Sequence, residues 1–259
     1  MKIGKLRLRG PVLAALLLSS VCAFAAERSA NDEEQVGNAA AAKILGSTKL
    51  LPSQATQSYV NTLGASIAAL SERPALRWRF AVIDSPDINA FAAPGGIVLV
   101  TRGLLKLLDT EDELAAVLCH EIGHVVRKHH YNVILRQRLA DEATRQMAAG
   151  EKDNELNELS HTSSVIYARG LDKGAEFDAD LYAMQLLAKA GYDASALLGV
   201  LEKLRSLHAG DGRAELLFST HPSPADRLDH VARAGAEGLP QPSPAARRNA
   251  RFQAAKSRQ

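Results

Sequence analysis

The chain is poor in cysteine and short of long apolar runs. Its two cysteines are Cys22 and Cys119, and the apolar run near its start extends only from Val12 to Leu18, which is short for a membrane span. Four basic residues precede this run and Ala23-Phe24-Ala25 follows it, a pattern typical of a secretory signal peptide. We expect residues 1–25 to be removed, which leaves Cys119 alone and excludes an intramolecular disulfide.

Two alternatives stay open for the N-terminal segment. It could remain as an uncleaved membrane anchor, or Cys22 could be lipid-modified, although Ser19-Ser20-Val21 is a poor lead-in for lipoprotein processing. Cleavage and export to the periplasm is the prediction. Cys119 is then expected to be a small buried core residue rather than a nucleophile or a metal ligand.

An excess of charge of one sign is also missing. The chain has 31 basic and 29 acidic residues, and four of the basic ones lie in the expected signal peptide. The mature protein is therefore nearly neutral, which gives no indication of a nucleic-acid partner. Residues 236–259 combine three prolines with several arginines and a single acid. We predict a basic, disordered tail there, with contact to an anionic membrane surface as an alternative to a purely solvated segment.

His120-Glu121-Ile122-Gly123-His124 is the H-E-x-x-H motif of a hydrolytic zinc site. On a helix, positions four apart differ by only about 40° around the axis, so both imidazoles face one point and Glu121 lies beside it. A catalytic zinc needs a third protein ligand and an open position for water, and a neighbouring carboxylate can move that water's protons. Thr110-Glu111-Asp112-Glu113 supplies a capping box at the start of this helix.

His130 has the spacing of the third histidine in the metzincin motif. That motif needs a glycine to turn the chain back, and Arg127 stands in its place. If the helix continues, His130 lies about 240° round from His124 and about 9 Å further along the axis. We therefore expect His129 and His130 to be exposed residues at the end of the helix.

Glu176-Phe177-Asp178-Ala179-Asp180 offers better candidates for the third ligand. The stretch has helical spacing, so Glu176 and Asp180, four residues apart, share a face. One carboxylate can bind the metal while the other accepts the free N–H of a ligating histidine. The alternative is an ordinary solvated acidic face.

Four blocks together resemble metallopeptidase family forty-eight, the gluzincin group that includes the HtpX-type and CAAX prenyl proteases. The chain looks most like the soluble periplasmic members of the BepA and LoiP type, from about Gln57 to about Leu228. The blocks are Asn89–Gly96, Leu118–His124, Glu176–Asp180 and Ser219–Arg227, the last with a late H-P-x-x-x-x-R signature.

The resemblance implies one Zn²⁺ per chain, with His120, His124 and Glu176 as ligands and Glu121 as general base. Asp180 would orient a ligand histidine. His221 and Arg227 would line the cleft, where either could stabilise an oxyanion; alternatively, His221 could close the site as a fourth ligand. A third interpretation makes His221 an ordinary turn residue before a helix that Ser223 caps and Pro224 begins.

The remaining pattern predicts a mainly helical α+β domain with a small β-sheet over residues 26–235, and the resemblance implies that it is a zincin domain of the gluzincin type. We expect two helices between residues 32 and 70, strands over 76–83 and 97–101 among about four in all, and polar helices over 133–147 and 154–167. The strand over 97–101 could hold an extended substrate along a free edge or be a core strand. The segment over 125–175 could be a lid or surface decoration.

These expectations together describe a zinc endopeptidase of the bacterial periplasm. By resemblance, its substrates would be unfolded or misassembled envelope proteins, with peripheral contact to the membrane or to outer-membrane assembly. The alternative is a periplasmic chaperone or assembly-binding protein whose zinc site is latent or structural. A metal hydrolase acting on non-peptide bonds is a third candidate.

Overall fold

The computed structural model describes residues 31–148, 170–207, 211–221, 223–234 and 245–259. A helix over residues 31–47 comes first. The others are α2 (Gln54–Ala68), α3 (Arg102–Leu107), α4 (Glu111–Val126), α5 (His129–Ala148), α7 (Lys173–Lys189), α8 (Ala196–Ser206), α9 (Glu215–Thr220), α10 (Pro224–Ala234) and α11 (Ala246–Lys256). The strands are β1 (Arg79–Ile83), β2 (Ala90–Ala93) and β3 (Ile97–Thr101). The predicted fold class, mainly helical with a small sheet, is confirmed.

The sheet has the order β1-β3-β2 within the described residues. β3 pairs in parallel with β1 and antiparallel with β2. Gly95 and Gly96 make the β2–β3 turn with φ angles of 77° and 98°, which favour glycine. β3 has the predicted bounds, and the strand expected over 76–83 begins later, at Arg79. Both edges of β3 are paired, so the expectation that it holds substrate along a free edge is wrong.

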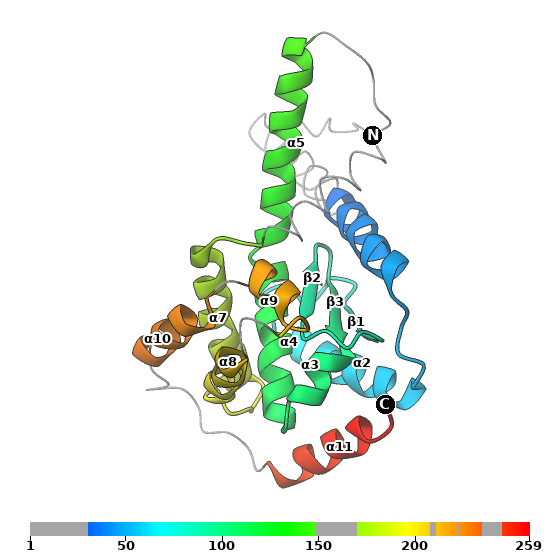
Figure 1. Cartoon of the computed structure of the whole chain (residues 1–259), viewed down its shortest axis with the longest axis vertical. Helices are drawn as coiled ribbons and strands as arrows, with labels where there is room; N and C mark the ends of the chain where they lie inside the picture. Colours follow the sequence, from blue (N-terminus) through cyan, green and yellow to red (C-terminus); the bar gives the residue numbers. More distant parts are fainter. Residues whose placement is uncertain (1–30, 149–169, 208–210, 222, 235–244) are drawn as a thin grey trace, which may run out of the picture.

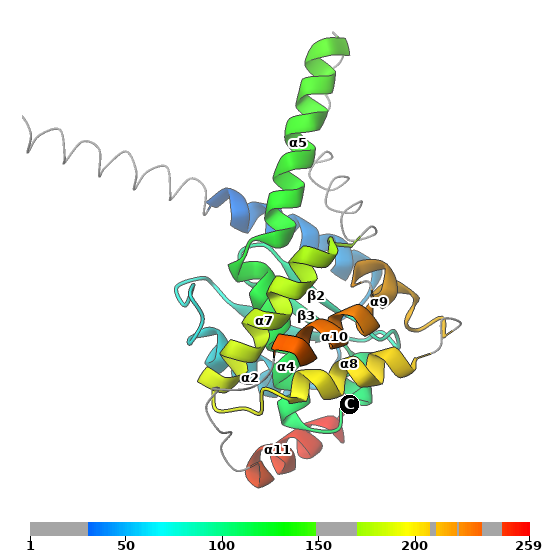
Figure 2. The same cartoon turned by 90° about the vertical axis from the view of Figure 1, so that its left-hand side faces the viewer.

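α4 lies at the centre of the molecule, with the sheet and α2 on one side and α7 and α8 on the other (Figures 1 and 2). Its apolar side chains, Leu114 and Ile122 among them, are fully buried, and so is Cys119, as predicted. The Thr110 hydroxyl accepts from the Glu113 N–H at 3.2 Å, the predicted N-cap bond. The Glu113 carboxylate accepts from Asp109 rather than from Thr110, so the capping box is only half formed.

α11 corrects the prediction of a disordered tail for residues 246–256. Phe252 is fully buried and Ala255 nearly so, while Arg248 pairs with Asp112 at 2.9 Å. The Arg251 guanidinium binds both carboxylate oxygens of Glu111. α11 thus packs against the N-terminal end of α4 and against α2. Its composition looked disordered because few residues are apolar, but those few fall on one helical face.

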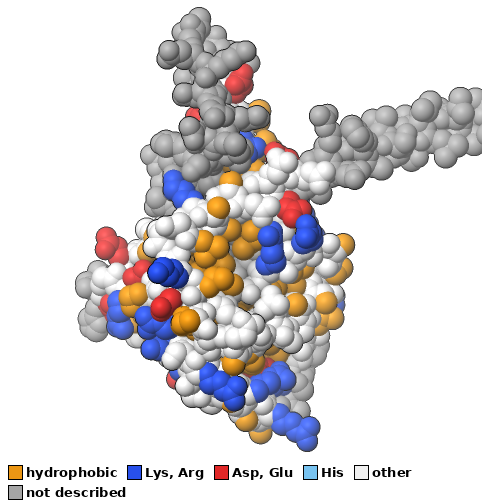
Figure 3. Space-filling view, turned by 90° about the vertical axis from the view of Figure 1, so that its right-hand side faces the viewer, with side chains coloured by type: hydrophobic (Ala, Val, Ile, Leu, Met, Phe, Trp, Pro, Cys, Tyr) orange, Lys and Arg blue, Asp and Glu red, His pale blue; other side chains and the backbone are white. Residues whose placement is uncertain are grey.

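α5 extends away from the body of the molecule in both views (Figures 1 and 2). It includes the helix predicted over 133–147. The helix predicted over 154–167 lies outside the described residues, as do residues 149–169 of the segment considered as a lid. No helix in the described ranges is long and apolar enough to cross a bilayer. On the face shown in Figure 3, lysine and arginine side chains stand apart around a central group of hydrophobic ones.

Candidate metal centre

The H-E-x-x-H motif lies in the C-terminal half of α4, where the helix is buried. His120 is 5 % exposed, His124 is 1 % exposed, and their Nε2 atoms are 2.9 Å apart. The helical spacing therefore brings both imidazoles to one point, as the sequence predicted. At this distance, one Nε2 atom can donate a hydrogen bond to the other, so only one of the two carries a hydrogen. Alternatively, both can present lone pairs to a shared cation.

α7 brings the predicted carboxylates to the same point. The two oxygens of Glu176 lie 3.6 Å from Nε2 of His120 and 3.5 Å from Nε2 of His124. Gly123 permits this approach, because a Cβ there would lie 3.2 Å from the Tyr182 ring and 3.3 Å from a backbone oxygen of α7. The glycine inside the motif is therefore what allows α7 to pack so close.

His221 is also at this centre. It lies at the end of α9, yet its ring is buried, with Nδ1 3.1 Å from Glu176 and Nε2 3.9 Å from Glu121. Ligand atoms of His120, His124, Glu176 and His221 all lie within 4.8 Å of one another. His221 is thus both in the predicted turn and directed into the site. The structure thus places His221 in the cleft, beside both Glu176 and Glu121.

Asp180 and Arg227 form a buried pair behind the ligands. Asp180 Oδ1 is 2.9 Å from Nδ1 of His120, the contact expected of a carboxylate that orients a ligand. Arg227 donates to both oxygens of Asp180, at 2.8 and 2.7 Å, and lies 3.2 Å from Glu176. Arg227 does line the cleft, but its guanidinium is largely engaged by these carboxylates, so the geometry favours neutralising them over binding an oxyanion.

The charges of the site follow from burial and pairing. Burial and Arg227 act to lower the pKa of His120, but the carboxylates of Asp180 and Glu176 outweigh them and raise it to about 9. Burial and the neighbouring His120 hold the pKa of His124 well below its usual value. Burial acts to raise the pKa of Glu176, but His221 and Arg227 hold it well below the ordinary range. Glu176 is therefore anionic.

Glu121 differs from the other carboxylates of the site. It is 2 % exposed, and its Oε2 atom has no hydrogen-bond partner among the residues that the structure describes. Burial raises its pKa, although the nearby His221 and His120 act against that shift. An unpartnered buried carboxylate oxygen is costly for stability and is typical of a functional position. Such an oxygen is free to accept a proton.

His129 and His130 are not the exposed residues that the sequence predicted. His130 is 8 % exposed, and the His129 side chain is only 13 % exposed. The helix does not continue past Arg127, because Lys128 takes a left-handed conformation with φ 58° and turns the chain into α5. This turn directs His129 back to His124, with their Nδ1 atoms 3.0 Å apart. A lysine in this conformation gives no sequence signal comparable to a glycine.

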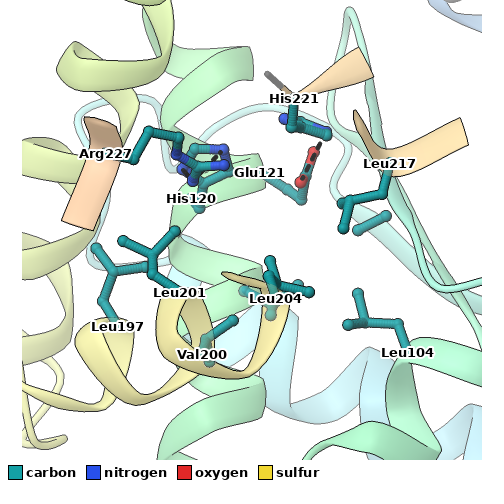
Figure 4. Close-up of a pocket in the computed structure, with 12 residues that line it drawn as sticks. Leu104, His120, Glu121, Leu197, Val200, Leu201, Leu204, Leu217, His221 and Arg227 are labelled. Atoms are coloured by element: carbon teal, nitrogen blue, oxygen red, sulfur yellow. Dashed lines mark hydrogen bonds and ion pairs between the residues drawn. The ribbon is translucent and has the colours of Figure 1, made fainter. Parts of the chain in front are cut away.

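An apolar pocket opens beside Glu121 (Figure 4). It encloses about 390 Å³, including its open mouth. His120, Glu121, His221 and Arg227 lie along one side, and α8 supplies much of the opposite wall (Figure 4). The apolar lining comprises Ala90, Leu104, Val117, Leu197, Val200, Leu201, Leu204 and Leu217. No sequence pattern indicated this pocket, because its walls come from separate elements.

A buried helix with H-E-x-x-H, joined by a carboxylate from a second helix, defines a metal-dependent peptidase of the zincin class. Comparison with known proteins places the chain within that class. The model of peptidase family M48 matches residues 54–234, more than half of the chain. The chain therefore belongs to the M48 family of metallopeptidases, and the resemblance found in the sequence is confirmed.

Several curated proteins are similar to the chain. Mitochondrial metalloendopeptidase OMA1 of Schizosaccharomyces pombe is 34 % identical over 188 residues, which cover 71 % of this chain and 54 % of the relative. The β-barrel assembly-enhancing protease of Escherichia coli is 28 % identical over 209 residues, 77 % of this chain and 43 % of the relative. Metalloprotease YcaL of E. coli is 31 % identical over 159 residues, which cover 59 % of this chain and 60 % of the relative. The chain thus matches about half the length of these relatives.

Proposed function

We propose that the protein is a zinc-dependent endopeptidase of the periplasm that cleaves unfolded or misassembled envelope proteins. The observation that carries the proposal is the buried group of His120, His124, Glu176 and His221, from α4, α7 and the end of α9, with the unpartnered oxygen of Glu121 beside it. A scaffold that bound metal only for structure would have no use for a free carboxylate oxygen at this point.

The donor set fits zinc. Imidazole nitrogens and one carboxylate are ligands that zinc prefers, with His120, His124 and Glu176 as the proposed set. The outer contacts fit as well, since Asp180 accepts from Nδ1 of His120 and leaves Nε2 for the ion. When bound there, zinc would polarise the scissile carbonyl and acidify water.

Proton transfer falls to Glu121. Its Oε2 accepts the proton that the attacking water loses, and the same carboxyl then protonates the amine nitrogen as the peptide bond breaks. His221 contacts Glu176 through Nδ1, its Nε2 lies 3.9 Å from Glu121, and it can donate a hydrogen bond to the oxygen that gains negative charge. Arg227 keeps Asp180 and Glu176 paired while the chemistry proceeds.

The pocket supports polypeptides that expose apolar side chains as substrates. It borders Glu121, which must reach the departing amine, so an apolar side chain flanking the scissile bond would enter it. Unfolded proteins expose such side chains and folded ones bury them. The signal-like pattern of residues 1–25 supports a periplasmic location. The relative named for β-barrel assembly supports envelope proteins as targets.

Glu121→Gln tests the proposal. The variant keeps the size of the side chain and all proposed ligands, so we expect one zinc per chain as in the wild type. Cleavage of an unfolded test protein should fall by about 10²–10⁴-fold, the usual contribution of a general acid–base group. Metal analysis and a peptidase assay with and without chelator give both readings. Retained cleavage in Glu121→Gln would refute the mechanism.

The second candidate is a binding protein with a closed metal site. It is favoured by one observation, the presence of His221 among the ligand atoms as a potential fourth donor. A wild-type protein that holds zinc and suppresses aggregation of an unfolded client, yet cleaves nothing even as His221→Ala, would select this candidate. Cleavage that increases in His221→Ala would instead indicate a latch on an active peptidase.

A further inference from the structure

The two metal-facing histidines of α4 have different outer partners. Nδ1 of His120 is 2.9 Å from the Asp180 carboxylate. Nδ1 of His124 has no carboxylate partner in the described part of the chain and is instead 3.0 Å from Nδ1 of His129. On its other side, Nε2 of His129 lies 3.2 Å from the Asp178 carboxylate. The result is a chain of contacts from Asp178 through His129 to His124.

The chain geometry that produces these contacts is local. α4 ends at Val126 and α5 begins at His129, with the left-handed Lys128 between them. Asp178 comes from α7, two residues from Glu176 and two from Asp180. α7, which provides the proposed third ligand, therefore also supplies a carboxylate for each of the two histidines. Asp180 contacts His120 directly, and Asp178 acts on His124 through the imidazole of His129.

The hydrogen-bonding capacity of these groups assigns the hydrogens. A carboxylate only accepts, so Nε2 of His129 must carry a hydrogen to bond Asp178. Neutral His129 then has a lone pair on Nδ1, and His124 must donate its Nδ1 hydrogen to it. This leaves the lone pair of His124 on Nε2, the atom 3.5 Å from Glu176 and 2.9 Å from Nε2 of His120.

We propose that His129 and Asp178 are positioning residues for His124. They hold its ring in the Nδ1–H tautomer and aim Nε2 at the metal. The inference rests on the proposed zinc site for its functional meaning, but the tautomer itself is a property of the metal-free protein. Outer partners of this kind typically contribute about 10–100-fold to metal affinity.

Three variants of the full chain test the assignment. His129→Ala removes the acceptor and should weaken zinc binding by about 10–100-fold in competition with a chromophoric chelator. His129→Asn puts an amide oxygen where Nδ1 was, so it should recover most of the affinity lost in His129→Ala. A residue that served only for packing would give no such recovery. Asp178→Asn should weaken binding less than His129→Ala, because an amide oxygen can still accept from Nε2.

Glu72→Gln is the matched control for Asp178→Asn. Asp178 pairs with Arg127 at 3.5 Å as well as with His129, and Glu72 pairs with the same Arg127 at 3.2 Å. Within the described residues, Glu72 forms no ion pair or hydrogen bond with His129, and its side chain is 61 % exposed. We expect zinc affinity to stay at the wild-type level in Glu72→Gln. An equal loss in both variants would assign the effect to Arg127 and overturn the proposal.

Imidazole ¹⁵N NMR of the metal-free protein gives a reading independent of zinc and of cleavage. The wild type should show His124 as the Nδ1–H tautomer, and His129→Ala should shift it toward the Nε2–H form. An Nε2–H tautomer in the wild type, or unchanged tautomer and zinc affinity in His129→Ala, would overturn the inference. If His129→Ala does not fold, the other two variants decide. A wild type without cleavage, but with the Nδ1–H tautomer, would contradict the proposed function alone.

Discussion

At the scale of single residues, the site is a set of buried charges that balance one another. Arg227 is a permanent cation that pairs with the carboxylates Glu176 and Asp180, which are each fully buried. Removing one partner of such a group leaves an uncompensated buried charge. The same arrangement explains why Glu176 stays ionised in a place where burial alone would protonate it.

Arg227→Met should therefore lower the free energy of unfolding by about 3–5 kcal/mol in the metal-free protein. Denaturant titration measures the loss, and added zinc should restore part of it by taking over the charge of Glu176. Arg205→Met is the control, because Arg205 pairs with Glu202 on the surface; its effect should stay within about 0.5 kcal/mol. Equal effects of the two substitutions would show that Arg227 is not the counter-charge of the site.

Zinc binding should depend on pH through His120. The pKa of this residue is raised to about 9, so the metal-free protein holds a proton there at pH 7.5 that a ligating imidazole must lose. Calorimetry in buffers of different ionisation enthalpy should show about one proton released per zinc at pH 7.5, and affinity that rises with pH up to about 9. His124 adds no proton, since its pKa is depressed.

The raised pKa of His120 also makes the stability of the fold depend on pH. A pKa raised above the unfolded value of about 6.5 stabilises the metal-free protein fully below that pH, and the contribution is lost as pH rises through about 9. Zinc binding without proton release at pH 7.5 would contradict both statements.

At the scale of elements, the contact between α4 and α7 sets the position of the third ligand. Gly123 is the point of closest approach, and Gly123→Ala forces a shift of a few tenths of an ångström against Ala179 and Tyr182. We expect overpacking of about 1–3 kcal/mol to outweigh the helix-propensity gain of about 1 kcal/mol, so the variant should melt lower and bind zinc more weakly.

Gly199→Ala is the control for that substitution. Gly199 lies in α8, where an added Cβ would meet only the Glu113 carboxylate at an ordinary 3.6 Å. The propensity gain should then prevail and stabilise the protein by up to about 1 kcal/mol. Zinc affinity should not change in Gly199→Ala. A stabilised Gly123→Ala with normal zinc affinity would show that the close approach is not needed.

Local rules explain which elements could be predicted. β3 is a run rich in β-branched residues that follows two glycines, and α4 has its own N-cap and a periodic apolar face. Both elements could therefore be predicted from a short stretch of sequence. Long-range packing decides the rest. Whether His129 returns to His124 depends on the left-handed Lys128, and whether β3 has a free edge depends on β1 and β2 together.

The candidate site shows the same division. H-E-x-x-H and the pair Glu176 and Asp180 have fixed helical spacing, so their shared faces could be derived before the fold was known. His221 and Arg227 came from a resemblance, and the structure places both at the centre. Asp178 and the apolar pocket could not be predicted, because each depends on contacts between elements distant in sequence. The role of His129 depends on the left-handed turn at Lys128, which has no sequence signal of its own.

At the scale of the whole molecule, α11 joins the C-terminal end of the chain to the helix that carries the motif. It lies beyond residues 54–234, the part that matches the family model. Phe252→Ala should destabilise the protein by about 3–5 kcal/mol, because the ring is a fully buried part of the main core and α11 packs against α2 and α4. Thermal unfolding measures this, with the exposed Arg247→Ala as control. An unchanged melting temperature in Phe252→Ala would show that α11 does not contribute to the stability of the fold through this ring.

The burial of Cys119 makes its thiol a probe for opening of the core. It is the sole cysteine of the described residues, it is inaccessible to solvent, and it directly precedes His120. A thiol reagent can reach it only in molecules whose central helix has come out of the core. The rate of alkylation therefore reports how often the core opens. A lower rate in the zinc-loaded protein than in the metal-free protein would measure how much zinc stabilises the closed core.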